Sequence, residues 1–140
     1  MTNNQKQDAA LSCALTAVFF AVIIGIWGIW YRTNDDAILS NIAFGAYGTD
    51  RVHLVYVNLL YGWLLRGLQC LNDSLNWFAL SQVGLLYAGT AVLTYYGIRH
   101  FGRLRGAVSA VAMMAAFGAN VLFRIQYTQT AALALCAGLV

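Results

Sequence analysis

The feature that most constrains this chain is a series of long segments without a single charged side chain. Asp, Glu, Lys and Arg are missing from runs of 23, 25, 18 and 16 residues, at 9–31, 74–98, 106–123 and 125–140. A helix of about 20 apolar residues crosses the hydrocarbon core of a membrane. Charged residues are 9% of the chain, against about 25% in soluble domains. The sequence therefore predicts an all-α, polytopic helical membrane protein.

We predict four membrane spans in one transmembrane domain, 1–140, and they lie at residues 9–31, 76–98, 105–123 and 126–140. The first span is too long for a signal peptide, and Trp27, Trp30 and Tyr31 at its end are typical interfacial anchors. The last span is short and lacks a polar flank. We therefore expect the chain to be an N-terminal fragment of a longer protein.

The segment between the first two spans is apolar but carries a regular polar pattern. Polar residues and a glycine recur every three or four positions, at Asn58, Gly62, Arg66, Gln69 and Asp73, which places them on one helical face. The pattern predicts an amphipathic helix in the membrane interface at residues 53–72. A second one is predicted at residues 35–47, where the apolar side chains of DDAILSNIAFGAYG fall on one side of a helix and its polar ones on another. The alternative is a membrane span at 52–71 whose Arg66 faces a protein interior.

The distribution of arginines separates these two topologies. If residues 52–71 do not cross and the N-terminus is cytoplasmic, the cluster RHFGRLR (99–105) is cytoplasmic as well. This agrees with the positive-inside rule, whereas a crossing segment would place the cluster outside. We expect a multi-pass protein of the cell membrane with a cytoplasmic N-terminus. Its net charge of +3 gives no reason to expect nucleic acid as a partner.

Two adjacent acids, Asp35 and Asp36, follow the first span in a chain that has five acidic residues in all. In the first turn of a helix they would interact favourably with the helix dipole, which is a structural role. Near an apolar surface a carboxylate can also act as a general base. Both interpretations remain open from the residues alone.

The basic candidates lie on the same predicted side of the membrane. Arg51 and His53 could bind an anion, or instead contact headgroups and cap a helix. Arg124, followed by Gln126, could bind a lipid phosphate or extend to ordinary headgroups. The three cysteines lack metal-ligand spacing, and we predict no metal site and no cofactor, although the carboxylates leave room for a divalent cation.

The order of these motifs resembles the N-terminal part of GT-C-type glycosyltransferases, in particular the mannosyltransferase and aminoarabinose-transferase branch. The motifs are NDD after the first span, DRVHLVYVNLLYGWLLRGL, the basic turn RHFGRLR, and FRIQYTQTAAL. In this chain His53 precedes Leu54 rather than the proline usual in that family. Family members are several hundred residues long, so the resemblance covers only their first spans.

The resemblance implies transfer of a sugar from a polyprenyl-phosphate donor to an acceptor on the outer face of the membrane. It implies that Asp35 or Asp36 is the catalytic base. It also implies that outer-face basic residues, with Arg124 and Arg51 as candidates, hold the lipid phosphate. We expect His53 and Gln126 to bind substrate as well. The expected partners are the lipid-linked donor and membrane lipids. The alternative is a small structural or assembly protein of the membrane without catalytic activity, and a transporter is disfavoured because the apolar runs contain no acid.

Overall fold

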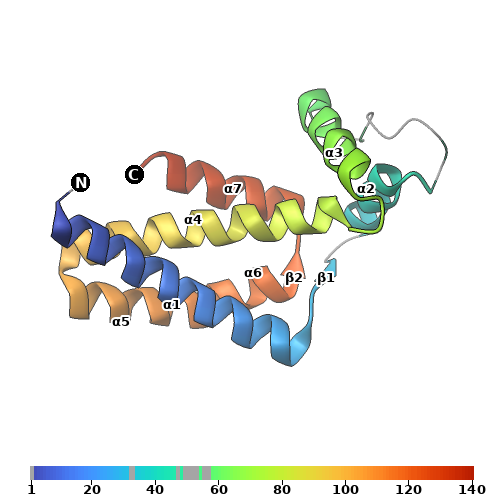
Figure 1. The fold of residues 1–140 in the computed structure, drawn as a ribbon. Coiled ribbons are helices and arrows are strands. Elements are labelled where there is room, and N and C mark those ends of the chain that lie inside the picture. The colour runs from blue at the N-terminus through green and yellow to red at the C-terminus, as the bar shows by residue number, and fades with distance from the viewer. Residues whose placement is uncertain (1, 32–33, 47, 49–53, 55–57) are drawn as a thin grey trace.

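The protein is a helical bundle with two further helices at one end (Figure 1). The computed structural model describes residues 2–31, 34–46, 48, 54 and 58–140. The central helix α4 contacts α1, α5 and α7. In chain order the elements are α1 (Asn3–Trp27), β1 (Trp30–Tyr31), α2 (Asn34–Phe44), α3 (Leu59–Leu71), α4 (Trp77–Phe101), α5 (Arg103–Met113), the π-helix η1 (Met114–Gly118), α6 (Ala119–Phe123), β2 (Arg124–Ile125) and α7 (Tyr127–Gly138).

Three helical segments are long and apolar enough to cross a membrane, and they correspond to the first three predicted spans. They are Asn3–Trp27, Trp77–Phe101 and Arg103–Leu122, with mean hydropathies of 2.5, 1.3 and 1.3. The fourth predicted span, 126–140, contains α7, which has 12 residues. A helix of that size is about 18 Å long, which is shorter than a hydrocarbon core of about 30 Å. Crossing by this segment therefore stays a prediction.

Local capping explains where the long helices begin. Thr2 and Gln5 form a reciprocal capping box, in which the Gln5 N–H donates to Thr2 Oγ1 at 3.3 Å and the Thr2 N–H donates to Gln5 Oε1 at 2.8 Å. Helix α1 consequently starts six residues before the predicted span. Asn76 caps α4 by accepting the Ala79 N–H at 3.0 Å, as asparagine favours.

Helices α4 and α5 form a tight hairpin that depends on glycine. Gly102, between them, has φ +84°, a backbone conformation that costs other residues energy. One turn later Gly106 touches the preceding helix, where an added Cβ would lie 2.5 Å from the Cα of Ile98 and 2.6 Å from the carbonyl oxygen of Gly97. The two backbones are therefore in direct contact beside the turn.

The first helix carries a buried polar seam although it is apolar overall. Asp8, Ser12 and Thr16 are spaced one turn apart and are buried. The Ser12 hydroxyl donates to the carbonyl oxygen of Ala91 on α4 at 2.9 Å. Small polar residues of this kind let membrane helices approach closely and hydrogen-bond across the contact. The seam fixes the face that α1 presents to α4.

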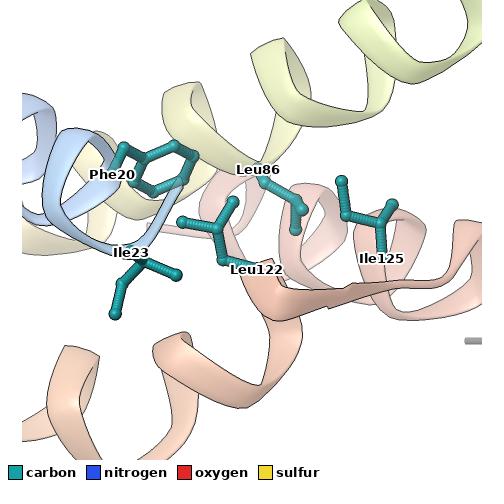
Figure 2. Close-up of a cluster of buried hydrophobic side chains, with 5 residues drawn as sticks. All are labelled: Phe20, Ile23, Leu86, Leu122 and Ile125. Carbon is teal, nitrogen blue, oxygen red and sulfur yellow. The ribbon is translucent and has the colours of Figure 1, made fainter. Parts of the chain in front are cut away.

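The buried apolar side chains form two clusters, one inside the bundle and one between α2, α3 and the start of α4. Figure 2 shows the bundle cluster, which joins α1, α4, α6 and β2 through Phe20, Ile23, Leu86, Leu122 and Ile125. The second cluster comprises Leu39, Ala43, Leu54, Leu65 and Phe78. It packs α2 and α3 onto the start of α4. We call α2 and α3, with this cluster, the end cap.

An apolar cavity of ≈ 110 Å³ lies beside the π-helix η1. Phe19 and Phe20 of α1, Leu86 of α4 and Leu133 of α7 are among its lining residues. In η1 the Ala119 N–H donates to the carbonyl oxygen of Met114, five residues earlier. The helix is therefore locally wider where the cavity lies.

The helix α3 is shorter than the amphipathic helix predicted at residues 53–72. It begins at Leu59, because the Asn58 side chain caps it by accepting the Leu60 N–H at 2.8 Å. Residues 53 and 55–57 lie outside the described residues. With 13 residues, α3 is about 20 Å long and is not among the helices long enough to span.

The predicted polar face of α3 is divided between protein and surroundings. Gly62 and Gln69, assigned to the polar face, are buried against the protein together with Leu65. Gln69 can be buried because its amide nitrogen donates to Asp73 Oδ1 at 2.9 Å and to the Asp73 carbonyl oxygen at 3.0 Å. The exposed face is largely apolar instead, and it includes Leu60, Trp63, Leu64 and Leu71. The placement of α2 and α3 in the membrane interface stays a prediction.

Candidate functional site

A short parallel strand pair brings together the two segments that contain the predicted site residues. Trp30 pairs with Arg124 and Tyr31 pairs with Ile125. Residues 30 and 31 precede α2, whose first turn contains the acidic pair, while Arg124 and Ile125 precede α7 and its N-cap residue Gln126. The strand pair holds the end of α1 beside the end of α6. The acidic and arginine-containing motifs therefore lie at the same end of the bundle (Figure 1).

Asp36 is the residue that joins these two motifs directly. Its side chain lies in the first turn of α2 and is 0% exposed. Its Oδ1 accepts the backbone N–H of Tyr127, the first residue of α7, at 2.9 Å. The first N–H groups of a helix have no partner within that helix. Asp36 therefore caps α7 across a separation of 91 residues, and it holds α2 against α7.

Asp35 differs from its neighbour in exposure. It also lies in the first turn of α2, but its side chain is exposed. Adjacent helical residues diverge by about 100°, which explains why one acid points into the protein and the other away from it. Of the two carboxylates, only that of Asp35 is open to a molecule approaching this end of the bundle.

The predicted basic and amide residues have separate positions. Arg124 is exposed on β2, and Gln126 is half-buried at the N-cap position of α7. The Gln126 side chain makes no capping bond, since Asp36 caps this helix instead. Arg51 and His53 lie outside the described residues, so their roles stay predictions.

A cluster of neutral polar side chains includes Ser40 of α2, the helix that contains the acidic pair. The Tyr31 hydroxyl donates to Ser40 Oγ at 3.0 Å. The Asn76 amide nitrogen donates to Ser40 Oγ at 2.8 Å and to the Tyr31 hydroxyl oxygen at 3.2 Å. Tyr31 belongs to β1, Ser40 to α2, and Asn76 is the N-cap residue of α4. The bonds therefore hold α2 to both β1 and the start of α4. Only Asn76 had a sequence signal, as an asparagine before an apolar run.

A second polar cluster connects α3 to α4. The Tyr61 hydroxyl hydrogen-bonds to Ser81 Oγ and accepts from the Gln82 amide nitrogen at 3.1 Å. Burial raises the pKa of Tyr61, and the bonds to Ser81 and Gln82 oppose this effect only in part. The phenol therefore keeps its proton at neutral pH and serves as a hydrogen-bonding group. The periodicity of 53–72 did not indicate this contact.

At this end of the bundle, α2 presents the exposed carboxylate of Asp35 and β2 presents the guanidinium group of Arg124. Asp35 can accept a proton, and Arg124 can bind an anionic oxygen. In the described ranges, no three His, Cys, Asp or Glu side chains gather where a metal ion could bind. Binding of a divalent cation at the acidic pair stays a prediction.

Comparisons with protein-family models, with curated proteins and with solved structures find no significant match to this chain.

Proposed function

We propose that this chain forms the acceptor-binding end of a membrane glycosyltransferase that uses a polyprenyl-phosphate-linked sugar. One observation carries the proposal, namely the bond between Asp36 Oδ1 and the Tyr127 N–H at 2.9 Å. It fixes the acidic pair of α2 to the segment that begins three residues earlier with Arg124. In this proposal the N-terminus is cytoplasmic, and the end cap lies at the outer face of the cell membrane.

The two aspartates have different roles in the proposed reaction. Asp36 is a positioning residue, because it is buried and its Oδ1 caps α7. Asp35 is the general base, because its exposed carboxylate can reach a bound acceptor. Its carboxylate takes the proton of the acceptor hydroxyl. That oxygen then attacks the anomeric carbon with inversion, while the bond from this carbon to the phosphate oxygen breaks.

The leaving polyprenyl phosphate takes the bonding electron pair and gains negative charge. Arg124 is the described side chain best placed to stabilise this charge, since it is exposed on β2 at the same end of the bundle. A guanidinium can donate two parallel hydrogen bonds to a phosphate. Stabilising charge that develops in the transition state is a large catalytic effect. Gln126, with Arg51 and His53 from the predicted set, would bind the same donor.

The test compares Asp35→Asn with Asp36→Asn. Membranes from cells that express the whole reading frame would be supplied with a radiolabelled polyprenyl-phosphate sugar, and the transferred label counted. We expect Asp35→Asn to lower transfer by about 100-fold or more without a change in membrane insertion. Asp36→Asn keeps an oxygen that can cap α7 and should retain most of the activity.

Full transfer by the Asp35→Asn protein would exclude Asp35 as the base. Loss of transfer in Asp36→Asn alone, with normal insertion, would move the catalytic role to Asp36.

A second candidate function is that of a structural or assembly protein of the membrane without catalysis. The cap on α7 favours it, because one of the two acids already has a structural role. Under this alternative the wild-type protein transfers no label, and both asparagine variants insert and assemble like the wild type.

A further inference from the structure

The end of the bundle opposite the end cap has an open groove at the α4–α5 hairpin, with a volume of ≈ 520 Å³. Its lining is Phe101, Leu104, Arg105, Val108 and Ser109. The three apolar side chains are strongly exposed, at 57% for Phe101, 78% for Leu104 and 61% for Val108. The groove is therefore an apolar strip beside one arginine and one hydroxyl.

The charges around this hairpin are unbalanced. The start of α1, the end of α4 and the start of α5 meet at this end of the bundle (Figure 1). These helix ends contain four basic residues, Lys6, Arg99, Arg103 and Arg105, and one acid, Asp8. Asp8 is shared by two arginines, since its Oδ2 lies 3.2 Å from Arg99 Nη1 and its Oδ1 lies 2.6 Å from Arg103 Nε. One carboxylate thus offsets two guanidinium groups. The four basic residues and one acid leave a net positive charge at this hairpin, which would attract an anionic partner.

Arg105 is the cation in the groove itself. It makes no hydrogen bond and no ion pair with any residue in the described part of the chain. The neighbouring first turn of α5 has no acidic side chain and no side-chain cap, so nothing there competes for the guanidinium. A phosphate group beside Arg105 would meet positive charge from the whole hairpin.

We propose that this groove binds an anionic phospholipid of the surrounding membrane. The phosphate lies against Arg105 and Ser109, and an acyl chain lies along Leu104, Val108 and Phe101. Charge complementarity selects the headgroup, as expected for basic residues at the end of a membrane span. The apolar strip selects a lipid over a soluble phosphate, because a free anion would leave those side chains in water. The proposal does not depend on the glycosyltransferase function.

The test uses the purified protein in nanodiscs made of equal parts phosphatidylglycerol and phosphatidylcholine. Native mass spectrometry after mild release measures the ratio of the two retained lipids. We expect the wild type to retain phosphatidylglycerol preferentially. Arg105→Gln should lower this ratio by about five-fold, the effect expected from one arginine near a membrane surface. Leu104→Ser should lower the total retained lipid without changing the ratio.

The matched control is Arg66→Gln, which removes an exposed arginine from α3 at the other end and should leave the ratio unchanged. An equal ratio in the wild type would overturn the proposal, as would an unchanged ratio in Arg105→Gln. Displacement of the bound phosphatidylglycerol by excess inorganic phosphate would also overturn it, because the site would then belong to a soluble anion.

Discussion

Two buried aspartates lie at opposite ends of the bundle, and they are held in different ways. Asp8, on α1, sits between the guanidinium groups of Arg99 and Arg103. Asp36, on α2, accepts the backbone N–H of Tyr127. Both side chains are almost fully buried. The Asp8 contact joins charges of opposite sign, whereas the cap by Asp36 requires only an oxygen acceptor.

The two aspartates therefore differ in which property of the side chain, its charge or its hydrogen-bond acceptor, the contact requires. At the Asp8 end the negative charge itself is required, because an amide there leaves two arginines uncompensated. At the Asp36 end, the bond from the Tyr127 N–H needs only a lone pair on a side-chain oxygen.

The largest expected effect comes from Gly106→Ala. This substitution would disrupt the α4–α5 hairpin, which contains Arg99 and Arg103, the two ion-pair partners of Asp8. The added Cβ would meet backbone atoms at 2.5 and 2.6 Å, and backbone cannot move aside as a flexible side chain can. We expect a loss of about 1–3 kcal/mol or more in stability, measured by thermal unfolding in detergent. Gly84→Ala, at a position with nothing within 4 Å, is the control and should be neutral or slightly stabilising. Equal effects of the two substitutions would contradict the close helix contact.

A smaller effect is expected from Asp8→Asn. The amide has no charge to offset Arg99 and Arg103, so α1 should detach more easily from the hairpin. The melting temperature should fall, and it should fall further in Asp8→Ala. Because both guanidinium groups are about half exposed, high salt should weaken the wild-type contact and narrow the difference between wild type and variant. A salt-independent difference would show that packing, rather than charge, holds this end.

The smallest effect should distinguish Asp36→Ala from Asp36→Asn. Alanine removes the cap of α7 and should cost about 1–2 kcal/mol, whereas asparagine caps about as well as aspartate. Hydrogen exchange at the Tyr127 amide provides a local measurement, and exchange should accelerate in the alanine variant. Similar acceleration in both variants would mean that the carboxylate charge is also needed at this end.

The sequence was sufficient for those parts of the fold that depend on composition and on local contacts. Uncharged runs identified the three long helices, because hydropathy is a property of the residues themselves. Caps such as Asn76 act within three residues along the chain, so a short sequence motif can indicate them. The helical start of α2 beside the acidic pair was predicted on the same local grounds.

The remaining features depend on contacts between distant segments. The bond from Tyr127 to Asp36 spans 91 residues, and the pairing of β1 with β2 involves two residues on each side, too few to give a periodic pattern. Periodicity placed Gly62, Gln69 and Asp73 on one face of α3, but it cannot distinguish a face that meets water from one that meets a polar protein surface. Gln69 could turn inward because Asp73 satisfies its amide group.

The π-helix η1 determines how this segment should respond to the insertion or deletion of a residue. A turn closed by a bond from Ala119 to Met114 holds one residue more than an α-helical turn, as if a residue had been inserted into this helical segment. Each extra residue rotates all that follows by about 100°, and the wider turn absorbs that rotation. Removing one residue from the Ala115–Ala116 pair would convert η1 to α-helix and leave Leu122 facing the bundle core. In this segment a deletion should therefore be tolerated better than a second insertion.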